Sequence, residues 1–460
     1  MSPILSSTPP LALTVAKFGG TSVADYNAMQ RSAQIVANSP ATRLVLISAC
    51  SGVTNLLVEL SQGIADNTLR QQRLQALHET HQSVLEQLQS PEAPAAAIQA
   101  LLDNIAILSE QAIDHPSAAI TDQLVANGEL LSTHLFTQIL QEQGIDAIRF
   151  DIRKVMRTDS QYGKATPNPT AIRQLSNDHL RGQLQHHVIV SQGFIGSDEN
   201  NHTTTLGRGG SDYSAALMAE AINATTLEIW TDVPGMYTTD PRIAAKAQPI
   251  KEISFSEASE MANFGAKILH PSTLVPAIRQ QIPVFVGSSK APEQGGTWIR
   301  QTVSDAPLFR ALALRCNQTM VTLTSLNMFH AYGFLAEVFR ILAEHKISVD
   351  LITTSEVSVS LTLDQTDTAG GAPTLPQAAI EALSEWCRVE VEQGLCLVAL
   401  IGNQMSHTQG SVSQVFGSLE QYQLRMVCYG ASPHNLCFLI DQDNAKPIVQ
   451  QLHQQLFEKH

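Results

Sequence analysis

Charged residues are scarce in this chain of 460 residues, and basic residues are the scarcer kind. Asp, Glu, Lys and Arg make up 15 % of the sequence, against roughly 25 % in an average soluble domain. The 28 Lys and Arg residues face 42 Asp and Glu residues, which gives a formal net charge of −14. Such a surface repels nucleic acid and anionic lipid, so we expect neither as a partner. Anionic small molecules stay allowed where a pocket gathers the few cations.

A long apolar run and a secretory leader are also lacking. We therefore expect no membrane span, a cytoplasmic protein, and a flexible N-terminal extension over residues 1–12. The six cysteines include no C-x-x-C pair. This pattern favours buried free thiols over a metal site or a redox site.

The length of the chain exceeds what one core can fill, so we expect two to four domains. Short apolar runs alternate with longer amphipathic ones up to about Ser288, which predicts an α/β sandwich with a mostly parallel sheet. The predicted strands are Leu13–Phe18, Leu44–Ala49, Ala147–Asp151, His187–Gln192, Thr226–Trp230 and Val284–Val286. The predicted helices are Ala24–Ala37, a long stretch over Leu69–Leu108, Thr121–Gln143, Ser211–Ala221 and Ser256–Gln280.

The C-terminal third contains an internal repeat, which follows a Gly- and Pro-containing loop at Ser288–Gly296. Met320–Leu323 aligns with Leu397–Leu400, and the offset of 77 residues then persists through both copies. Each copy is predicted to form a strand, a loop with Gly, a helix and two strands. A repeat present only twice indicates two small tandem domains rather than a solenoid.

A first candidate phosphate site lies at Lys17 to Ser22 (KFGGTS), between a predicted strand and a predicted helix. Two glycines let the backbone approach an anion, the helix start offers free N–H groups, and Lys17 adds a positive charge. An ordinary strand-to-helix turn also favours Gly and Thr, so both interpretations stay open. The lysine precedes the glycines, which excludes the Walker pattern.

A second cluster is the run GRGGSDY at Gly207–Tyr213. Ser211 is predicted to cap the following helix, with Asp212 in its first turn, and this structural role competes with a functional one. Arg208 between glycines fits bidentate binding of a carboxylate.

A third cluster, Trp230–Arg242, follows a predicted strand end and supplies an aromatic ring, two carboxylates and an arginine. Most loops rich in turn residues are only loops, but this set is enough to hold a nucleotide. Lys267 is a single cation in an apolar stretch, where a lysine that merely extends its ammonium to the surface is the competing interpretation.

Taken together, these motifs resemble aspartokinases of the amino acid kinase family. The runs KFGGTS, GRGGSDY and WTDVPGMYTTDPR occur in the family's order, and the double repeat resembles its tandem ACT domains. The resemblance covers nearly the whole chain and is greatest to the monofunctional, lysine-sensitive type, aspartokinase III. It implies a catalytic domain over residues 13–295, a first ferredoxin-like ACT domain over 306–392, and a second over 393–460. The C-terminal segment would then be able to complete the first copy, so that the copies interleave.

The resemblance also implies roles for individual residues. Mg²⁺ is expected to accompany ATP, with no protein ligand to the metal assigned. Lys17, Asp212 and Lys267 are the implied catalytic residues. ATP contacts are implied for Lys17, Phe18, Gly19, Gly20, Thr231, Asp232, Tyr237, Arg242, Lys267 and Ile268. Aspartate contacts are implied for Ser48, Thr54, Glu129, Arg208, Gly209, Gly210 and Ser211, with Glu129 on the α-ammonium and Arg208 on the α-carboxylate. Without the resemblance, a carboxylate on a helix surface is the favoured interpretation of Glu129.

The implied reaction transfers phosphate from ATP to the side-chain carboxylate of L-aspartate, the first step toward lysine, threonine and methionine. That carboxylate has a pKa near ~4 and is ionised at pH 7, so no general base is needed. The reaction instead requires cations that neutralise the phosphates and the amino acid. Asp212 is then expected to orient lysines or hydroxyl groups rather than to act as a base.

The two repeat copies differ in charge, which suggests an effector site. Ser348, Asp350 and Glu356 of the first copy align with Arg425, Val427 and Pro433 of the second. By the resemblance, feedback L-lysine binds the first ACT domain of a homo-oligomer, a dimer or a tetramer, across a subunit interface. The implied lysine contacts are Met328, Gly333, Phe334, Leu335, Ser348, Val349, Asp350 and Glu356. Ala331 stands where related lysine-sensitive enzymes have Ser. Asp350 and Glu356 as plain solvated residues are the alternative.

Other functions stay in competition on sequence alone. A glutamate, acetylglutamate or uridylate kinase fits the same catalytic fold but does not account for the tandem repeat. An inactive kinase domain fused to an amino acid sensor is a second class, disfavoured because Lys17, Arg208, Asp212 and Lys267 occur together. A NAD-dependent dehydrogenase is the most remote alternative.

Overall fold

The computed structural model describes residues 12–265, 269, 271–328, 332–364 and 372–458. The chain divides into two compact units. The first unit takes most of the chain up to Val303, whereas the second takes 237–248, 256–265 and the part from Ser304 onward. Among the described helices, none has the length and apolarity that crossing a membrane requires.

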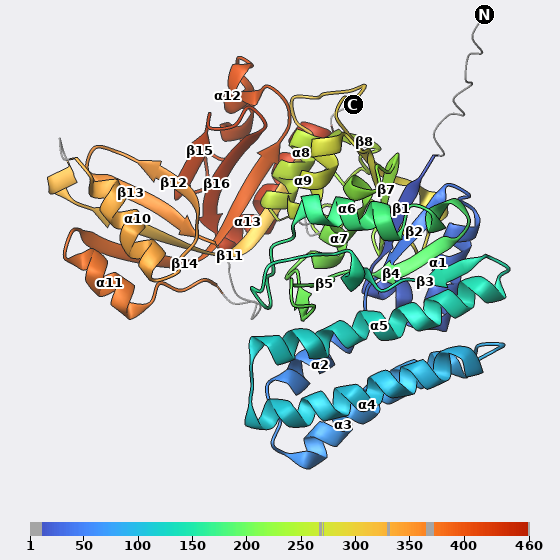
Figure 1. Ribbon diagram of the computed structural model, residues 1–460. Helices are drawn as coiled ribbons and strands as arrows, with labels where there is room; N and C mark the ends of the chain where they lie inside the picture. The colour runs from blue at the N-terminus through green and yellow to red at the C-terminus, as the bar shows by residue number, and fades with distance from the viewer. Residues whose placement is uncertain (1–11, 266–268, 270, 329–331, 365–371, 459–460) are drawn as a thin grey trace, which may run out of the picture. The chain divides into compact units, whose positions relative to one another are not determined.

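The first unit is built on a sheet of eight strands in the order β3-β4-β2-β1-β7-β9-β10-β8 (Figure 1). All neighbouring strands are parallel except β9 and β10. All residues of β1 and β4 are buried, as expected of a sheet covered on both faces. The strands are β1 (Thr14–Phe18), β2 (Thr42–Ile47), β3 (Ala147–Arg149), β4 (Val188–Gln192), β7 (Thr226–Thr231), β8 (Glu252–Ser254), β9 (Val284–Ser288) and β10 (Gly296–Arg300).

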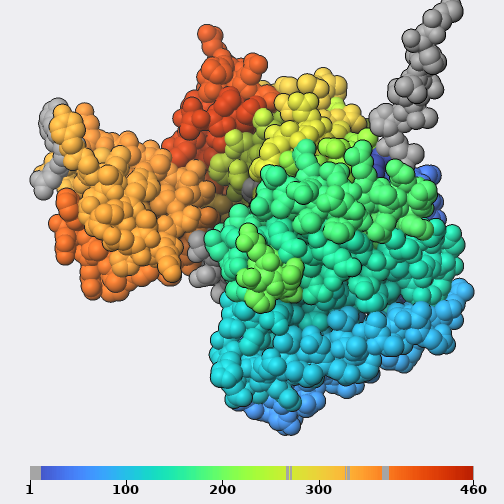
Figure 2. Space-filling model, in the orientation of Figure 1, coloured from blue at the N-terminus to red at the C-terminus, as the bar shows by residue number. Residues whose placement is uncertain are grey.

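Helices cover both faces of this sheet. On one face α7 contacts β1, β2 and β7, with α6 and α9 beside it; on the other, α5 contacts β2, β3 and β4. Helices α2, α3 and α4 form a further layer against α5, and Figure 2 shows part of this layer at the surface in light blue. The helices are α1 (Tyr26–Ala37), α2 (Val53–Ser61), α3 (Asn67–Leu85), α4 (Glu92–Asp114), α5 (Ala118–Glu142), α6 (Pro169–His179), α7 (Gly210–Ala221) and α9 (Pro271–Gln280).

The predicted fold class is confirmed, and all six predicted strands of this sheet are present. The single helical stretch predicted over Leu69–Leu108 is wrong. The helix is interrupted between α3 and α4, and Pro91 precedes the first turn of α4. The predicted helix over Ser256–Gln280 is likewise interrupted: α8 (Phe255–Asn263) ends before Gly265, whose φ of 104° is left-handed. The loop at Ser288–Gly296 leads into β10, a further strand of the same sheet.

The second unit contains a six-stranded antiparallel sheet in the order β12-β13-β11-β14-β16-β15. The repeat is visible in its elements, since α10 and α12 begin 77 residues apart, as do β12 and β15. The strands are β11 (Ala311–Thr324), β12 (Val349–Thr354), β13 (Ser358–Leu363), β14 (Arg388–Ile401), β15 (Met426–Tyr429) and β16 (Asn435–Asp441). The helices are α10 (Phe334–Glu344), α11 (Gln377–Ser384), α12 (Ser411–Phe416) and α13 (Gln442–Phe457).

The long strand β11 belongs to both copies of the repeat. Its first half pairs with Leu397–Ile401, and its second half pairs with Arg388–Glu392. Leu312 packs in the core of the second copy, whereas Val321 packs in the core of the first. The C-terminal helix α13 packs in the core of the second copy. The copies therefore interleave through β11, and the segment that crosses over is not the C-terminal one.

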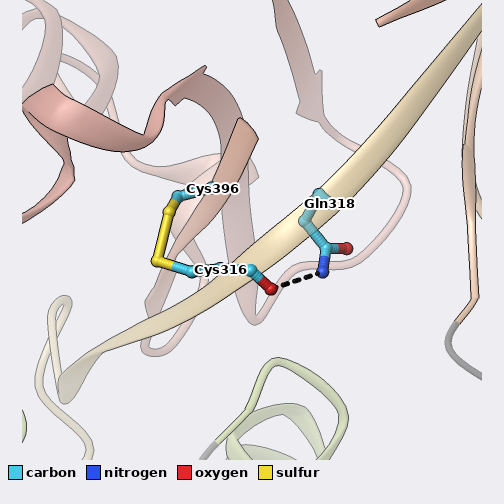
Figure 3. The surroundings of a disulfide bond; sticks show 3 residues. All are labelled: Cys316, Gln318 and Cys396. Atoms are coloured by element: carbon cyan, nitrogen blue, oxygen red, sulfur yellow. Dashed lines mark hydrogen bonds between the residues drawn. A yellow bond between two sulfur atoms is a disulfide. The ribbon is translucent and has the colours of Figure 1, made fainter. Parts of the chain in front are cut away.

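A disulfide joins Cys316 of β11 to Cys396 of β14, with their Cα atoms 4.0 Å apart (Figure 3). It lies where the β11–β14 register shifts, beside Gln318, whose side-chain amide donates to the Cys316 carbonyl. The prediction of free thiols is wrong for this pair, because only the register of two strands brings the cysteines together. The other four cysteines are free. Three of them are buried, and Cys428 is half-buried.

Candidate functional site

The centre of the candidate site is an ion pair at the end of β1. The ammonium of Lys17 lies 2.5 Å from the carboxylate of Asp212, and both side chains are largely buried. Lys17 is the strand residue that faces α7, while its neighbour Phe18 packs against Phe136 of α5 on the opposite face. Strand alternation thus directs Lys17 to the helix that carries Asp212. The structure brings these two predicted residues together.

The turn after β1 brings its backbone close to neighbouring strand ends. The amide of Gly19 donates to the Trp230 carbonyl over 3.0 Å. A side chain at Gly20 would place its Cβ 3.0 Å from the Ala49 carbonyl oxygen, so only glycine fits without a shift. Gly20 also begins a short 3-10 helix, η1 (Gly20–Val23). The carboxyl ends of β1, β2 and β7 therefore meet at one edge of the sheet, where open α/β sheets bind ligands.

The GRGGSDY run contains the turn before α7 and the first residues of that helix. Gly207 and Gly209 have φ values of 75° and 67°, a left-handed conformation that favours glycine. Arg208 between them is exposed. Gly209 is the residue before the first turn and makes no side-chain cap, so the predicted capping role of Ser211 is wrong; Ser211 lies inside the helix. Asp212 is in the first turn of α7, as predicted.

Glu129 is the most unusual carboxylate of the site. It lies on α5 and is 3 % exposed. Its Oε1 accepts a hydrogen bond from the Ala49 amide over 3.2 Å, whereas its Oε2 is buried and accepts none from the described residues. Burial raises the pKa of Glu129 to about 8, although the Ala49 amide and the charge of Lys17 act in the opposite direction. An unpartnered, buried oxygen of this kind fits an incoming cation.

Ser48 and Thr54 belong to the segment after β2, which contacts this carboxylate through the Ala49 amide. Ser48 follows β2, and its carbonyl accepts a hydrogen bond from Ser132, three residues after Glu129 on α5. Thr54 is in the first turn of α2, which begins after Gly52 in the left-handed conformation. Both side chains are half-buried. The segment between β2 and α2 is thus held against the part of α5 that contains Glu129.

A hydroxyl network that the sequence did not reveal ties the strand ends together. The Ser289 hydroxyl oxygen lies 2.6 Å from the Ser22 hydroxyl and 3.2 Å from the Thr231 carbonyl oxygen, and the Ser289 amide donates to that carbonyl. Thr231 in turn donates its hydroxyl to Asp232. Ser289 lies in the predicted loop Ser288–Gly296, where no motif marks it.

Two of the remaining predicted nucleotide residues are described. Tyr237 and Arg242 are part of the second unit. Arg242 makes a bidentate ion pair with Asp240, with Nη2 2.6 Å from Oδ2, and this pair lowers the pKa of Asp240. Lys267 and Ile268 lie outside the described residues.

The predicted effector residues cluster around the first copy of the repeat. Gly333, with φ of 88°, precedes α10, and Phe334 is buried in a core that Met328 and Val349 contact. Leu335 is 38 % exposed.

The polar effector residues lie along and after strand β12. Asp350 on β12 forms an ion pair with Arg315 of β11. Ser348 donates to Asp364 over 3.4 Å, and Glu356 is exposed in the turn after β12. Ala331 lies outside the described residues.

Comparison with protein families supports these assignments of fold. Residues 12–288 match the amino acid kinase family, and residues 321–378 and 398–456 match the ACT domain. The chain is 55 % identical over 447 residues to lysine-sensitive aspartokinase 3 of Escherichia coli K12, covering 97 % of this chain and 99 % of the relative. It is 32 % identical to the chloroplastic aspartokinase 1 of Arabidopsis thaliana, covering 96 % and 80 %.

Solved structures give the same result. The chain superposes on E. coli aspartokinase III in complex with aspartate and ADP with a TM-score of 0.89, covering 97 % of this chain and all of that one. For the same enzyme in complex with lysine and aspartate the TM-score is 0.82, at the same coverage. Sequence identity is 55 % in both cases. With both domain types matched and near-complete coverage, this chain belongs to the aspartokinases of the amino acid kinase family.

Proposed function

We propose that the protein is an aspartate kinase, which transfers the γ-phosphoryl group of ATP to the side-chain carboxylate of L-aspartate and gives ADP and 4-phospho-L-aspartate. The observation that carries this proposal is the pairing of Lys17 with Asp212 beside a buried Glu129 that has an unpartnered oxygen. A site of this kind offers one positive group for phosphate and one negative group for an amine. The similar E. coli enzyme has been solved with aspartate and ADP.

The nucleotide would bind at the carboxyl ends of β1 and β7. The tight turn at Gly19 and Gly20 leaves backbone close to the phosphates, and Lys17 supplies the charge. Thr231 and Asp232 follow Trp230 at the end of β7. The Trp230 carbonyl accepts a hydrogen bond from Gly19 of this turn, so the two residues lie next to it. Tyr237, Arg242, Lys267 and Ile268 stay predicted contacts.

Aspartate would be held at its α-carbon by opposite charges. Glu129 takes the α-ammonium, because a buried carboxylate gains most from a cation that replaces lost water. Arg208 takes the α-carboxylate, since its exposed position between two left-handed glycines suits bidentate binding. Ser48, Thr54, Gly209, Gly210 and Ser211 complete the predicted set.

The chemistry needs charge neutralisation rather than proton transfer. The attacking carboxylate is already ionised at neutral pH. The Lys17–Asp212 pair is neutral overall, so the triphosphate requires further positive charge, and Mg²⁺ carried on its phosphates fits this need. When bound, Mg²⁺ would offset the charge that spreads over the transferring group. Asp212 would hold the Lys17 ammonium in place for the phosphates.

We also propose that L-lysine inhibits the enzyme by binding the first ACT copy. Asp350 offers a carboxylate for the amine of lysine, whereas Val427 stands at the equivalent position of the second copy. Strand β12 is at the edge of its sheet, and an edge strand can pair with a second copy of the chain. A homo-oligomer assembled through the ACT copies follows as part of the proposal.

A coupled assay of ADP release tests the function. We expect release that depends on both ATP and L-aspartate, with L-glutamate and UMP giving less than about a hundredth of that rate. A second assay with NAD and its reduced form should give no turnover. Release with UMP or glutamate as the preferred acceptor would contradict the proposal.

A further inference from the structure

Asp122 is a buried carboxylate that the proposed chemistry does not use. It lies in the second turn of α5 and is 1 % exposed. Both of its oxygens lie 3.0 Å from the Gly163 amide. The Thr205 amide donates to one oxygen over 2.9 Å, and the Thr205 hydroxyl donates to the other over 2.8 Å. Asp122 takes part in none of the ion pairs among the described residues.

A buried carboxylate without a counterion is costly, and here hydrogen bonds alone compensate it. Burial raises the pKa of Asp122, and the bonds from Gly163 and Thr205 act against that rise. A buried apolar residue of similar size would avoid this cost. The carboxylate is therefore best explained by the segments that it holds.

Asp122 holds two loops at once. One is the stretch 159–166, which contains Gly163, and the other follows β6 (Thr203–Thr205). The two loops also contact each other, since the Ala165 amide donates to the Thr205 carbonyl over 2.8 Å. A Cβ on Gly207 would lie 3.2 Å from the Gly163 carbonyl oxygen. Arg208 is the next residue in the chain.

The same helix carries the other end of the aspartate site. Glu129 follows Asp122 by seven residues, which is two turns of α5 and about 10 Å along its axis. Residues at this spacing share one face of a helix. One rigid helix thus fixes Glu129 directly and the Arg208 loop through Asp122.

We propose that Asp122 is a positioning residue for aspartate binding, because it holds the Arg208 loop at a fixed place relative to Glu129. The inference rests on the proposed function, in which Arg208 and Glu129 bind the amino acid. It also assigns the 159–166 loop to the support of the substrate site, although no motif marks that loop. Asp122 itself touches neither substrate.

The test compares KM for aspartate with KM for ATP in Asp122→Asn. The amide would present an NH₂ group to backbone donors and lose part of the network. We expect KM for aspartate to rise at least about tenfold, as for loss of a buried hydrogen-bond network, with KM for ATP within about twofold of the wild type. Thr205→Val removes only the hydroxyl donor, and should raise KM for aspartate about threefold. If Asp122→Asn fails to fold, the KM values of Thr205→Val test the positioning role instead.

Glu142→Gln is the matched control on the same helix. Glu142 accepts a hydrogen bond from the Ser90 amide over 3.0 Å and so ties α5 to a loop without predicted site residues. Its KM for aspartate should stay within about twofold. An active wild type whose Asp122 and Thr205 variants keep the wild-type KM for aspartate overturns this inference alone. A rise in both KM values together would show a merely structural role and overturn it too. A wild type without aspartate-dependent turnover overturns the proposed function as well.

Discussion

The ammonium of Lys17 lies 2.5 Å from the carboxylate of Asp212, so the end of β1 is bonded to the first turn of α7. The pair joins two motifs that are far apart in the sequence. It also restrains the only lysine that the structure places at the turn of Gly19 and Gly20 among the described residues. A neutral pair orients the lysine yet leaves its remaining N–H groups to bind phosphate.

The first prediction concerns Lys17. Lys17→Ala should lower kcat at least a hundredfold, because it removes the positive charge next to the transferring phosphoryl group. Circular dichroism should show an unchanged fold. Lys154→Ala, which removes an exposed lysine of the same unit, should keep full activity. A Lys17→Ala enzyme that retains most of its turnover would exclude Lys17 from this role.

The second prediction concerns Glu129 and pH. In the unfolded chain this carboxyl has its ordinary pKa of 4.5, and burial raises it to about 8 in the fold. The folded protein therefore binds the proton more tightly, and this contribution to stability is lost as the pH rises from about 4.5 to about 8. Glu129→Gln has no carboxyl group to titrate, so its stability does not include this pH-dependent contribution. Denaturant unfolding at pH 5 and pH 8 should show the variant gaining on the wild type at the higher pH. A difference that is independent of pH would contradict the assignment.

The pH dependence of KM for aspartate tests the ionisation of Glu129 independently. If Glu129 must be ionised to hold the α-ammonium, KM for aspartate should rise in the wild type as the pH falls from about 8.5 to 6.5. In Glu129→Gln, KM for aspartate should be at least tenfold higher and flat over this range. The KM for ATP serves as the internal control. Parallel pH profiles of the wild type and the variant would speak against an ionic contact.

A third prediction concerns feedback control. Asp350→Asn should raise the lysine concentration needed for half-inhibition more than tenfold, because the amine of the effector loses its charged partner. Velocity without lysine should stay within about twofold. Glu420→Gln, an exposed acid of the second copy, should leave inhibition intact. Unchanged inhibition of Asp350→Asn would move the effector to another site.

The fourth prediction concerns the disulfide between Cys316 and Cys396. Alkylation of the unfolded, unreduced protein should label four of the six cysteines. Reduction should lower the free energy of unfolding by about 2–4 kcal/mol, the typical contribution of a disulfide. A variant with serine at both positions should not respond to the reductant, whereas Cys428→Ser should respond like the wild type. Six labelled cysteines would contradict the bridge.

Much of the fold was predictable because its signals are local. The strands of the first sheet that lie between helices are continuous apolar runs. The two copies of the repeat show the same order of strands and helix at a constant offset in the sequence. Strands β8 and β10 escaped prediction because each follows a stretch rich in turn residues. The exchange of β11 between copies was also hidden, since it depends on which half of a long strand pairs with which partner.

The site was predictable where a motif carries it. Lys17, Arg208 and Asp212 stand in glycine-rich runs, whereas Glu129 needed the family resemblance. Asp122 and Ser289 had no signal at all, because each acts through hydrogen bonds to backbone that only the fold brings near. The pairing of Cys316 with Cys396 is of the same kind, for sequence spacing contains no strand register.

The proposed reaction can be tested by detecting the acyl phosphate itself. Purified protein, ATP, Mg²⁺ and L-aspartate are incubated with hydroxylamine, which converts an acyl phosphate into a hydroxamate, with and without millimolar L-lysine. We expect aspartyl hydroxamate in proportion to ADP, and a marked fall of both when lysine is added. Formation of ADP without hydroxamate, or with no dependence on aspartate, would contradict it.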